Sequence, residues 1–287
     1  MKIFWGLVLG LAVGLSGCSQ PASSDSKNTN TSDITTITMA STGSDADIWR
    51  FIATLPETKK AGIQLDVKDF TDYVSMNTAV ANNEIDINAF QSYSYLVAFN
   101  DNNKTKIYPI STTYLEPMGI YSSKVKNVQD FEQGATIAIP NDAANEARAL
   151  LLLQSAGILK LRADFNPATG TPDDITENDK SIVIKPIQMA TAVRVKDEVD
   201  AIVLGNTLAL EGGLNVLKDA IYYEPIDQTT RLNVNVLAVS ASRKDDAILQ
   251  KVGGLYHTDA VKQYVLEHFG GTKVDVNKPI SYLTDAK

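Results

Sequence analysis

Strand-like and helix-like segments alternate along most of the chain, and this alternation limits the possible folds more than any other feature. Strands that alternate with helices form mostly parallel sheets with helices on both faces. Helices are expected at residues 45–60 and 74–83, in NEARALLLLQSAG, and near the C-terminus. Strands are expected at residues 34–40, 62–70, 85–90, 106–112, 135–140, 181–187, 201–205 and 233–239. The sequence therefore predicts an α/β protein.

Two stretches that lie more than a hundred residues apart share one layout. AVANNEIDINAFQ (Ala79–Gln91) and AVRVKDEVDAIVLGN (Ala192–Asn206) each read as a helix ending in Glu-Ile/Val-Asp, then a strand, then an amide residue. Ligands of open α/β sheets bind outside the carboxyl ends of the strands. The echo favours two similar lobes whose strand ends face each other across a cleft, although Glu-x-Asp before a strand is also a common turn.

The N-terminal residues read as a secretory signal rather than as part of the fold. Lys2 supplies a basic start, and the apolar run Ile3–Leu15 is too short to span a bilayer comfortably. The run ends in LSGC, which resembles a bacterial lipobox and contains Cys18, the only cysteine. We therefore expect a signal peptide at residues 1–17 and a lipid anchor on Cys18 at the extracytoplasmic face of the cell membrane. The alternative is an ordinary signal with a chance cysteine.

The segment that follows Cys18 reads as a tether. Residues Ser19–Asp33 are rich in Ser, Asn and Thr and have no apolar period, so they cannot bury enough surface to fold. We expect residues 18–33 to be a flexible tether and the globular part to begin near Ile34. Because there is no second cysteine, its stability must come from the core alone.

Composition and motif searches favour a binding protein over an enzyme. The formal net charge of −8 weighs against nucleic acid and against adhesion to anionic lipid by charge. The two histidines, His257 and His268, belong to no cluster with metal-ligand spacing, and neither a G-x-S-x-G elbow nor a phosphate loop is present. We therefore predict no catalytic residue, no metal and no cofactor. A carboxylate-pair hydrolase stays open at this stage.

The stretch IPNDAANEARALLLL suggests a site for an anion. A buried strand ends at Pro140 and a helix begins at once, so the helix turns its positive end toward the strand termini. Asn145 and Arg148 are three residues apart and share a helix face. An arginine fork there suits a carboxylate, which it binds in a bidentate way. Alternatively, Arg148 is a surface residue that pairs with Asp142 or Glu146.

The stretches DINAFQSYSYL, PMGIYSSKVKNVQDF, ATIAIPNDAANEARALLLLQSAGILKL and NVNVLAVSASR point together to one family. They resemble the NlpA-type lipoproteins, which are the methionine-binding, solute-binding lipoproteins of ABC importers. The likeness runs from about Ile34 to Phe269, and the lipobox agrees with it.

The resemblance implies a two-lobed periplasmic-binding-protein fold, type II-like, with a ligand cleft between the lobes. Each lobe would be a mixed, mostly parallel sheet flanked by helices. Lobe 1 would comprise residues 34–118 and 238–287, and lobe 2 residues 119–237. The two crossings between the lobes are expected near Pro117–Tyr121 and Asn233–Ala238.

The resemblance also implies an amino-acid ligand, best taken as methionine. Arg148 would grip its carboxylate with support from Asn145, and Asn206 and Asn235 would hold its polar end. The side-chain pocket would be walled by three aromatic residues, Tyr73, Phe90 and Tyr95.

One departure from the family pattern bears on the ligand. Where the family usually has His after Asn-Ala-Phe-Gln, and Pro two positions later, this chain has Ser92 and Ser94. Ser92 cannot reproduce the reach of an imidazole, so another apolar amino acid or a short Met-containing peptide remains open. The expected partners are the ligand, a separate ABC permease and its ATPase, and the membrane through the lipid anchor. The receptor itself is expected to be a monomer. The competing interpretations are an extracytoplasmic enzyme on the same fold and an adhesin.

Overall fold

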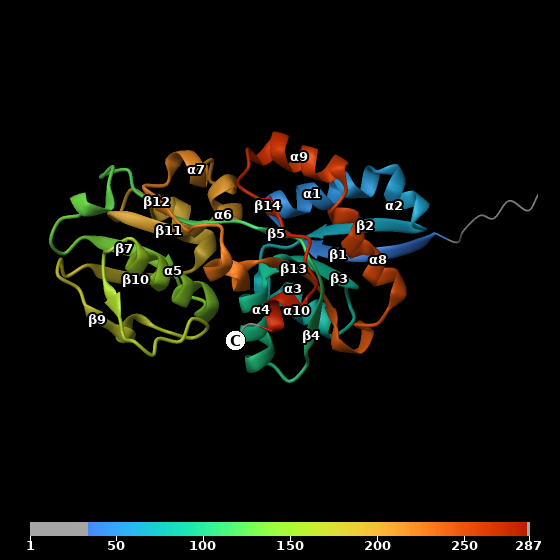
Figure 1. Ribbon diagram of the computed structural model, residues 1–287, viewed down its shortest axis with the longest axis horizontal. Coiled ribbons are helices and arrows are strands. Elements are labelled where there is room, and N and C mark those ends of the chain that lie inside the picture. The colour runs from blue at the N-terminus through green and yellow to red at the C-terminus, as the bar shows by residue number, and fades with distance from the viewer. Residues whose placement is uncertain (1–33, 286–287) are drawn as a thin grey trace, which may run out of the picture. The chain divides into compact units, whose positions relative to one another are not determined.

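The computed structural model describes residues 34–285, which form two lobes, each built on a five-stranded sheet (Figure 1). The expected signal peptide, the expected tether and Cys18 lie outside the described residues. No helix in residues 34–285 is both long enough and apolar enough to cross a membrane.

The sheet of lobe 1 has the strand order β2-β1-β3-β13-β4. Its strands are β1 (Thr35–Ser41), β2 (Ile63–Asp69), β3 (Ile87–Ser92), β4 (Ile107–Thr112) and β13 (Asn235–Ser240). The sheet of lobe 2 has the order β10-β7-β11-β6-β12. Its strands are β6 (Met118–Tyr121), β7 (Thr136–Pro140), β10 (Val183–Ile187), β11 (Ala201–Gly205) and β12 (Tyr222–Tyr223).

The two sheets follow the same plan. In the described lobes, β13 runs antiparallel to both of its neighbours, and so does β6, while the other strands of each sheet share one direction. Each of these antiparallel strands is the first sheet strand after a crossing between the lobes, β6 after the first crossing and β13 after the second. The predicted echo follows the same plan, because β3 and β11 hold the third position in their sheets. The fold is thus the mixed, mostly parallel, two-lobed α/β architecture expected from the sequence.

The chain crosses between the lobes twice. It leaves lobe 1 after the short strand β5 (Tyr114–Leu115) and returns through η4 (Gln228–Asn233). The sequence places the second boundary at 237/238, but β13 already pairs within the first sheet from Asn235, which lies opposite Ser92. The second crossing therefore lies between β12 and β13.

Helices cover the sheets on both faces (Figure 1). Those of lobe 1 are α1 (Gly43–Thr54), α2 (Pro56–Lys60), α3 (Tyr73–Ala81), α4 (Tyr93–Asn102), η5 (Ala241–Arg243), α8 (Ala247–Tyr256), α9 (Asp259–Phe269) and α10 (Ser281–Thr284). Those of lobe 2 are η1 (Val128–Asp130), α5 (Ala143–Ser155), η2 (Pro172–Asp174), η3 (Met189–Val195), α6 (Asn206–Glu211) and α7 (Val216–Asp219). Short strands β14 (Val274–Asp275), β8 (Lys160–Leu161) and β9 (Ile175–Glu177) complete the described elements.

The expected single helix at residues 45–60 is in fact two helices. Leu55 is extended, with φ −71° and ψ 141°, and Pro56 opens α2. A residue that precedes proline is disfavoured in the helical region, so the chain turns at Leu55.

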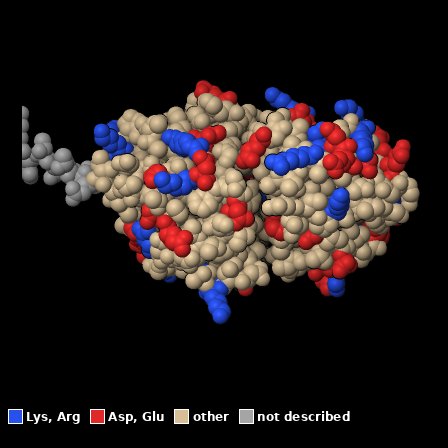
Figure 2. All heavy atoms as spheres, turned by 180° about the vertical axis from the view of Figure 1, so that it is seen from behind, with Lys and Arg blue, Asp and Glu red and all other residues tan. Residues whose placement is uncertain are grey.

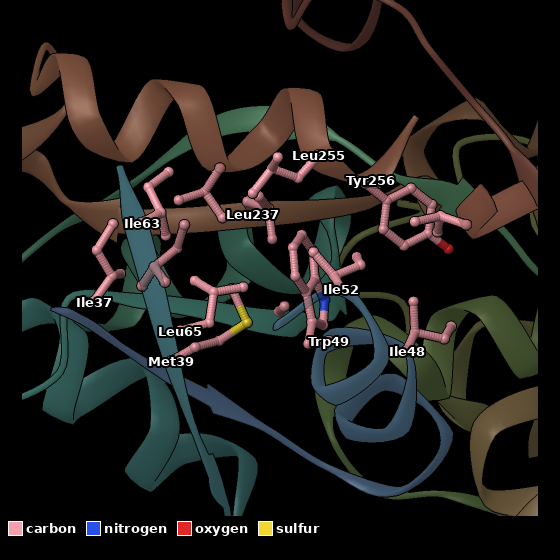
Figure 3. Close-up of a cluster of buried hydrophobic side chains, with 14 of the residues drawn as sticks. Ile37, Met39, Ile48, Trp49, Ile52, Ile63, Leu65, Leu237, Leu255 and Tyr256 are labelled. Carbon is pink, nitrogen blue, oxygen red and sulfur yellow. The ribbon is translucent and has the colours of Figure 1, made fainter. Parts of the chain in front are cut away.

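Each lobe has its own apolar core. In lobe 1, Trp49 and Ile52 from α1 pack with Met39 from β1 and Tyr256 from α8, as Figure 3 shows. In lobe 2, α5 packs Leu150 against the sheet. Full burial of such a side chain stabilises the fold by roughly 1.5–3 kcal/mol. These cores fix the strand ends that border the cleft.

The surface carries charges of both signs without a basic patch on the face seen in Figure 2. Lys and Arg side chains lie among Asp and Glu there, over both lobes. On this face the distribution agrees with the acidic net charge of −8.

Candidate functional site

A cavity lies between the lobes where the carboxyl ends of β3 and β11, the start of β13 and the first turns of α5 meet. Its volume is about 50 Å³, well below the roughly 300–1,000 Å³ of ordinary small-molecule pockets. A ligand larger than a few waters therefore requires its walls to move apart. The cavity is lined by Tyr73, Phe90, Gln91, Ser92, Tyr95, Glu116, Asn145, Arg148, Met189, Gly205, Thr207, Leu208 and Asn235.

Most residues that the sequence nominated for the ligand site line this one cavity. They come from α3, β3, α4, α5 and β13, and they are Tyr73, Phe90, Ser92, Tyr95, Asn145, Arg148 and Asn235. Asn206 does not line the cavity itself. It is fully buried at the start of α6, between Gly205 and Thr207, which do line it.

Three aromatic rings form one wall of the cavity. The ring centroid of Tyr73 lies 5.1 Å from that of Phe90 and 6.2 Å from that of Tyr95, and the Phe90 and Tyr95 centroids are 5.9 Å apart. Burial raises the pKa of the Tyr73 and Tyr95 hydroxyls, so both stay neutral. The wall can therefore surround an apolar or thioether side chain while excluding water.

Local hydrogen bonds place Ser92 and Asn235 beside that wall. Ser92 caps α4, since its Oγ accepts from the N–H of Tyr95 at 3.2 Å. In the amide orientation that satisfies its neighbours, Asn235 Nδ2 donates to the carbonyls of Phe90 and Gln91, each at 3.2 Å. Both polar side chains are thus held by the backbone that carries the rings.

The start of α5 is fixed by hydrogen bonds to one acidic side chain. Asp142 is the N-cap, and its Oδ1 accepts from the N–H of Asn145 at 3.0 Å. The Asn145 side chain also donates to Asp142, at 3.0 and 3.2 Å. This arrangement fixes the first turn and directs Arg148, one turn later, to the cavity wall.

Arg148 is buried and forms an ion pair that the sequence did not identify. Its Nε donates to Glu224 Oε1 at 2.8 Å, and its Nη2 donates to Glu224 Oε2 at 2.6 Å and to the carbonyl of Glu116 at 2.9 Å. The alternative of a surface arginine paired with Asp142 or Glu146 is wrong, because Arg148 is only 9% exposed and its counter-ion is Glu224.

This ion pair changes how Arg148 can bind the carboxylate of a ligand. Of the five N–H groups of a guanidinium, those on Nε and Nη2 of Arg148 are engaged, and the two on Nη1 have no hydrogen-bond partner within residues 34–285. A ligand carboxylate can therefore bind at Nη1 but not along the side edge, which Glu224 occupies. Burial opposes the charge of Arg148, but Glu224 more than compensates, so the pKa of Arg148 is raised.

Asn206 presents an unpaired acceptor next to the cavity. Its Nδ2 donates to Glu116 Oε2 at 2.9 Å and to Thr272 Oγ1 at 3.1 Å, which fixes the orientation of the amide. Its Oδ1 is buried and has no donor within the described part of the chain. A buried acceptor without a partner is costly, and this one belongs to a residue that lies between two cavity-lining residues, Gly205 and Thr207.

A buried ionic cluster joins the lobes behind the cavity. Lys273 is fully buried, and its Nζ donates to Asp45 Oδ1 at 2.9 Å, to Glu116 Oε2 at 2.7 Å and to Thr207 Oγ1 at 2.9 Å. Asp45 lies on α1 in lobe 1, Thr207 on α6 in lobe 2, and Glu116 in the first crossing. Lys273 therefore ties both lobes to the crossing strand.

The two carboxylates of this cluster are shifted in opposite directions. Burial raises the pKa of Asp45 to about 6, against the lowering effect of Lys273. Burial also acts to raise the pKa of Glu116, but Lys273 and Asn206 outweigh it, so that pKa is lowered. Both carboxylates are therefore mostly charged at pH 7, and Asp45 is the first of the two to take up a proton as the pH falls.

Sequence reasoning missed Glu116, Glu224 and Lys273. Their partners lie far away along the chain, by 76 residues for Arg148 and Glu224 and by 157 for Lys273 and Glu116. One signal was present in the sequence. LEPMG and YEPID each place a Glu-Pro pair at the start of a crossing between the lobes.

Among the described residues, no group of three or more His, Cys, Asp or Glu side chains could hold a metal ion. The polar groups of the cavity are an arginine, amides and hydroxyls, with one carboxylate that Lys273 neutralises. Such a set can orient a small zwitterion by hydrogen bonds and charge.

Comparison with known proteins identifies the family. The sequence profile of the NlpA lipoprotein family matches residues 37–277. The chain belongs to the NlpA lipoprotein family. The profile covers nearly all of both lobes, including every residue named above for the cavity.

Three relatives show what this NlpA lipoprotein is similar to. A probable D-methionine-binding lipoprotein MetQ of Pasteurella multocida is 31% identical over 272 residues, which cover 94% of this chain and 96% of that protein. A nutrient-binding protein from Burkholderia cenocepacia, solved bound to methionine, is 36% identical, with a TM-score of 0.79 over 83% of this chain and 99% of that one. The substrate-binding protein of a methionine transporter from Streptococcus pneumoniae is 35% identical, with a TM-score of 0.77 over 84% and 95%.

These relatives are binding proteins, so the family supports a solute-binding role and not an enzyme. The family name and the relatives also agree with a lipoprotein.

Proposed function

We propose that this protein captures methionine in the cavity between its lobes and delivers it to an ABC permease. The observation that carries the proposal is the buried guanidinium of Arg148, whose Nη1 N–H groups are unengaged among residues 34–285, at a cavity with a wall of three aromatic rings. A dry cleft with an arginine at one end and rings at the other suits a zwitterion with an apolar tail.

The polar ends of the ligand have matching partners. The carboxylate would bind Arg148 Nη1, with Asn145 beside it. The ammonium would donate to Asn206 Oδ1, which has no partner within the described residues. Asn235 would border the ligand from the start of β13, and the thioether would lie against Tyr73, Phe90 and Tyr95, where sulfur–ring contacts contribute about 0.3–1.5 kcal/mol each.

The delivery cycle requires no chemical step. Because the cavity is too small for an amino acid as it stands, we propose that the lobes open to admit the ligand and close on it by bending at the two crossings. The monomer would remain tethered to the membrane by lipidated Cys18, and separate permease and ATPase subunits would move the solute.

The ligand is tested by a thermal-shift screen of the purified protein against the twenty amino acids and a few Met-containing dipeptides. A ligand that binds only the folded state raises the unfolding midpoint by mass action. We expect the largest shift with methionine. Because Ser92 replaces the family's histidine, the second candidate is another apolar amino acid or a short Met-containing peptide, and a larger shift with either would replace methionine. No shift with any of them would contradict the proposal.

A further inference from the structure

Glu224 is the direct counter-ion of the residue that we assign to the ligand carboxylate. Its two oxygens accept from Arg148 Nε and Nη2, and both side chains are at least nine-tenths buried. Arg148 also donates to the backbone carbonyl of Glu116, whose carboxylate pairs with Lys273 at 2.7 Å. The charge of Asp142 also acts on Arg148 and helps to raise its pKa, but Asp142 accepts no hydrogen bond from the guanidinium within residues 34–285.

The Glu224 carboxylate is itself held firmly. Its Oε2 also accepts, at 2.8 Å, from the backbone N–H of Met118, which begins β6 at the end of the first crossing. Its Oε1 accepts from Asn233 Nδ2, at 3.4 Å, in the second crossing. Because these bonds come from both crossings, Glu224 cannot swing aside without disturbing them when a ligand arrives.

This arrangement has an electrostatic consequence for the ligand. An incoming carboxylate must share one guanidinium with a carboxylate that already neutralises it, in a buried place where charges interact strongly. A ligand with only a carboxylate would leave the site with an uncompensated negative charge. A zwitterion brings its own ammonium group and so adds no net charge. The N–H groups of that ammonium can donate a hydrogen bond to Asn206 Oδ1.

We infer that Glu224 is a positioning residue that makes the cleft select a zwitterionic amino acid over the same molecule without its ammonium group. The inference rests on the proposed function, since it assumes that the ligand carboxylate binds at Arg148. Glu224 acts through Arg148: it fixes the guanidinium so that only Nη1 faces the ligand, and its charge sets the charge that the ligand must carry.

The test measures two ligands by calorimetry, L-methionine and 4-(methylsulfanyl)butanoate, which is methionine without its amino group. We expect the wild type to bind methionine at least about 100-fold more tightly, which corresponds to about 2.7 kcal/mol. In Glu224→Gln, we expect this ratio to fall by about tenfold or more, mainly because the deaminated ligand binds more tightly. Glutamine keeps an acceptor for the Met118 N–H, so the crossing is preserved.

A matched control is Glu146→Gln. Like Glu224→Gln, it removes one carboxylate charge. Glu146 lies on α5 with Arg148 but forms no hydrogen bond with the guanidinium. This control should keep the wild-type ratio. An equal loss of affinity for both ligands in Glu224→Gln would show a purely structural role and overturn the inference. Equal binding of both ligands by the wild type would overturn it without any variant. If the wild type binds neither ligand, the proposed function itself fails.

Discussion

The Lys273 ammonium lies 2.7 Å from Glu116 Oε2 and 2.9 Å from Asp45 Oδ1, with all three side chains buried. This contact connects the C-terminal segment, the first crossing and α1 behind the cavity. Taking charges out of water is expensive, so such a cluster persists only because each charge has a partner. Lys273 is therefore a structural centre of the region between the lobes.

Replacing Lys273 with methionine should be strongly destabilising. Two buried carboxylates would then face each other without their cation, and breaking a buried ion pair on one side costs about 3–5 kcal/mol. Urea unfolding measures the loss. The control is Lys262→Met, because Lys262 is 45% exposed and pairs only loosely with Asp275 at 3.6 Å, so its loss should cost less than about 1 kcal/mol. Equal, small losses in both variants would contradict the role of Lys273.

The Asp45 carboxyl should make stability depend on pH in a defined window. Its pKa is about 6 in the folded protein against an ordinary value of 3.8, so the folded state holds the proton more tightly between pH 4 and 6. The stabilisation from this group is therefore present below pH 4 and is lost as the pH rises through 6, by about 3 kcal/mol in all.

The variant Asp45→Asn removes that titration. From pH 4 to pH 7, the free energy of unfolding of the variant should rise relative to that of the wild type, as measured by urea unfolding at each pH. A difference between the two proteins that stays constant over this range would show that Asp45 does not titrate there.

The aromatic wall should distinguish a thioether from a methylene. We expect the wild type to bind methionine about 2- to 10-fold more tightly than norleucine, which matches the energy of sulfur–ring contacts. The variant Phe90→Leu should remove most of this preference, because the ring faces the cavity. The control Phe51→Leu alters a ring that stacks on Tyr264 instead, at 4.1 Å, and should leave the preference unchanged. A preference that survives in Phe90→Leu would place the sulfur elsewhere.

The architecture was predictable from local pattern, and particular elements show why. β11 was expected at Ala201–Gly205 and has those bounds. The short apolar run ends where the polar residue Asn206 begins, so the ends of the strand are clear from the sequence. α5 begins at Ala143, directly behind the strand that ends at Pro140, as the sequence indicated. The expected single helix at residues 45–60 is wrong, because Pro56 disfavours a helical conformation at Leu55 and the chain turns there.

The site was predictable only in part, for a physical reason. The rings and polar residues that line the cavity belong to short motifs at strand ends. Such motifs can be recognised in the sequence, and strand ends of the two lobes meet at the cleft. The charges behind them pair across distances such as the 228 residues between Asp45 and Lys273. Such partners have no period or spacing in the sequence, and only the fold shows that Glu224 occupies one edge of Arg148.

The measurement that most directly tests the central claim is calorimetry of L-methionine with the double variant Arg148→Met, Glu224→Gln. Changing both partners avoids leaving a buried charge unpaired, which the single change at Arg148 would do. We predict that the double variant unfolds cooperatively near the wild-type midpoint and binds methionine at least about 100-fold more weakly, a loss of about 2.7 kcal/mol. Wild-type affinity in this folded double variant would contradict the claim that Arg148 holds the ligand carboxylate.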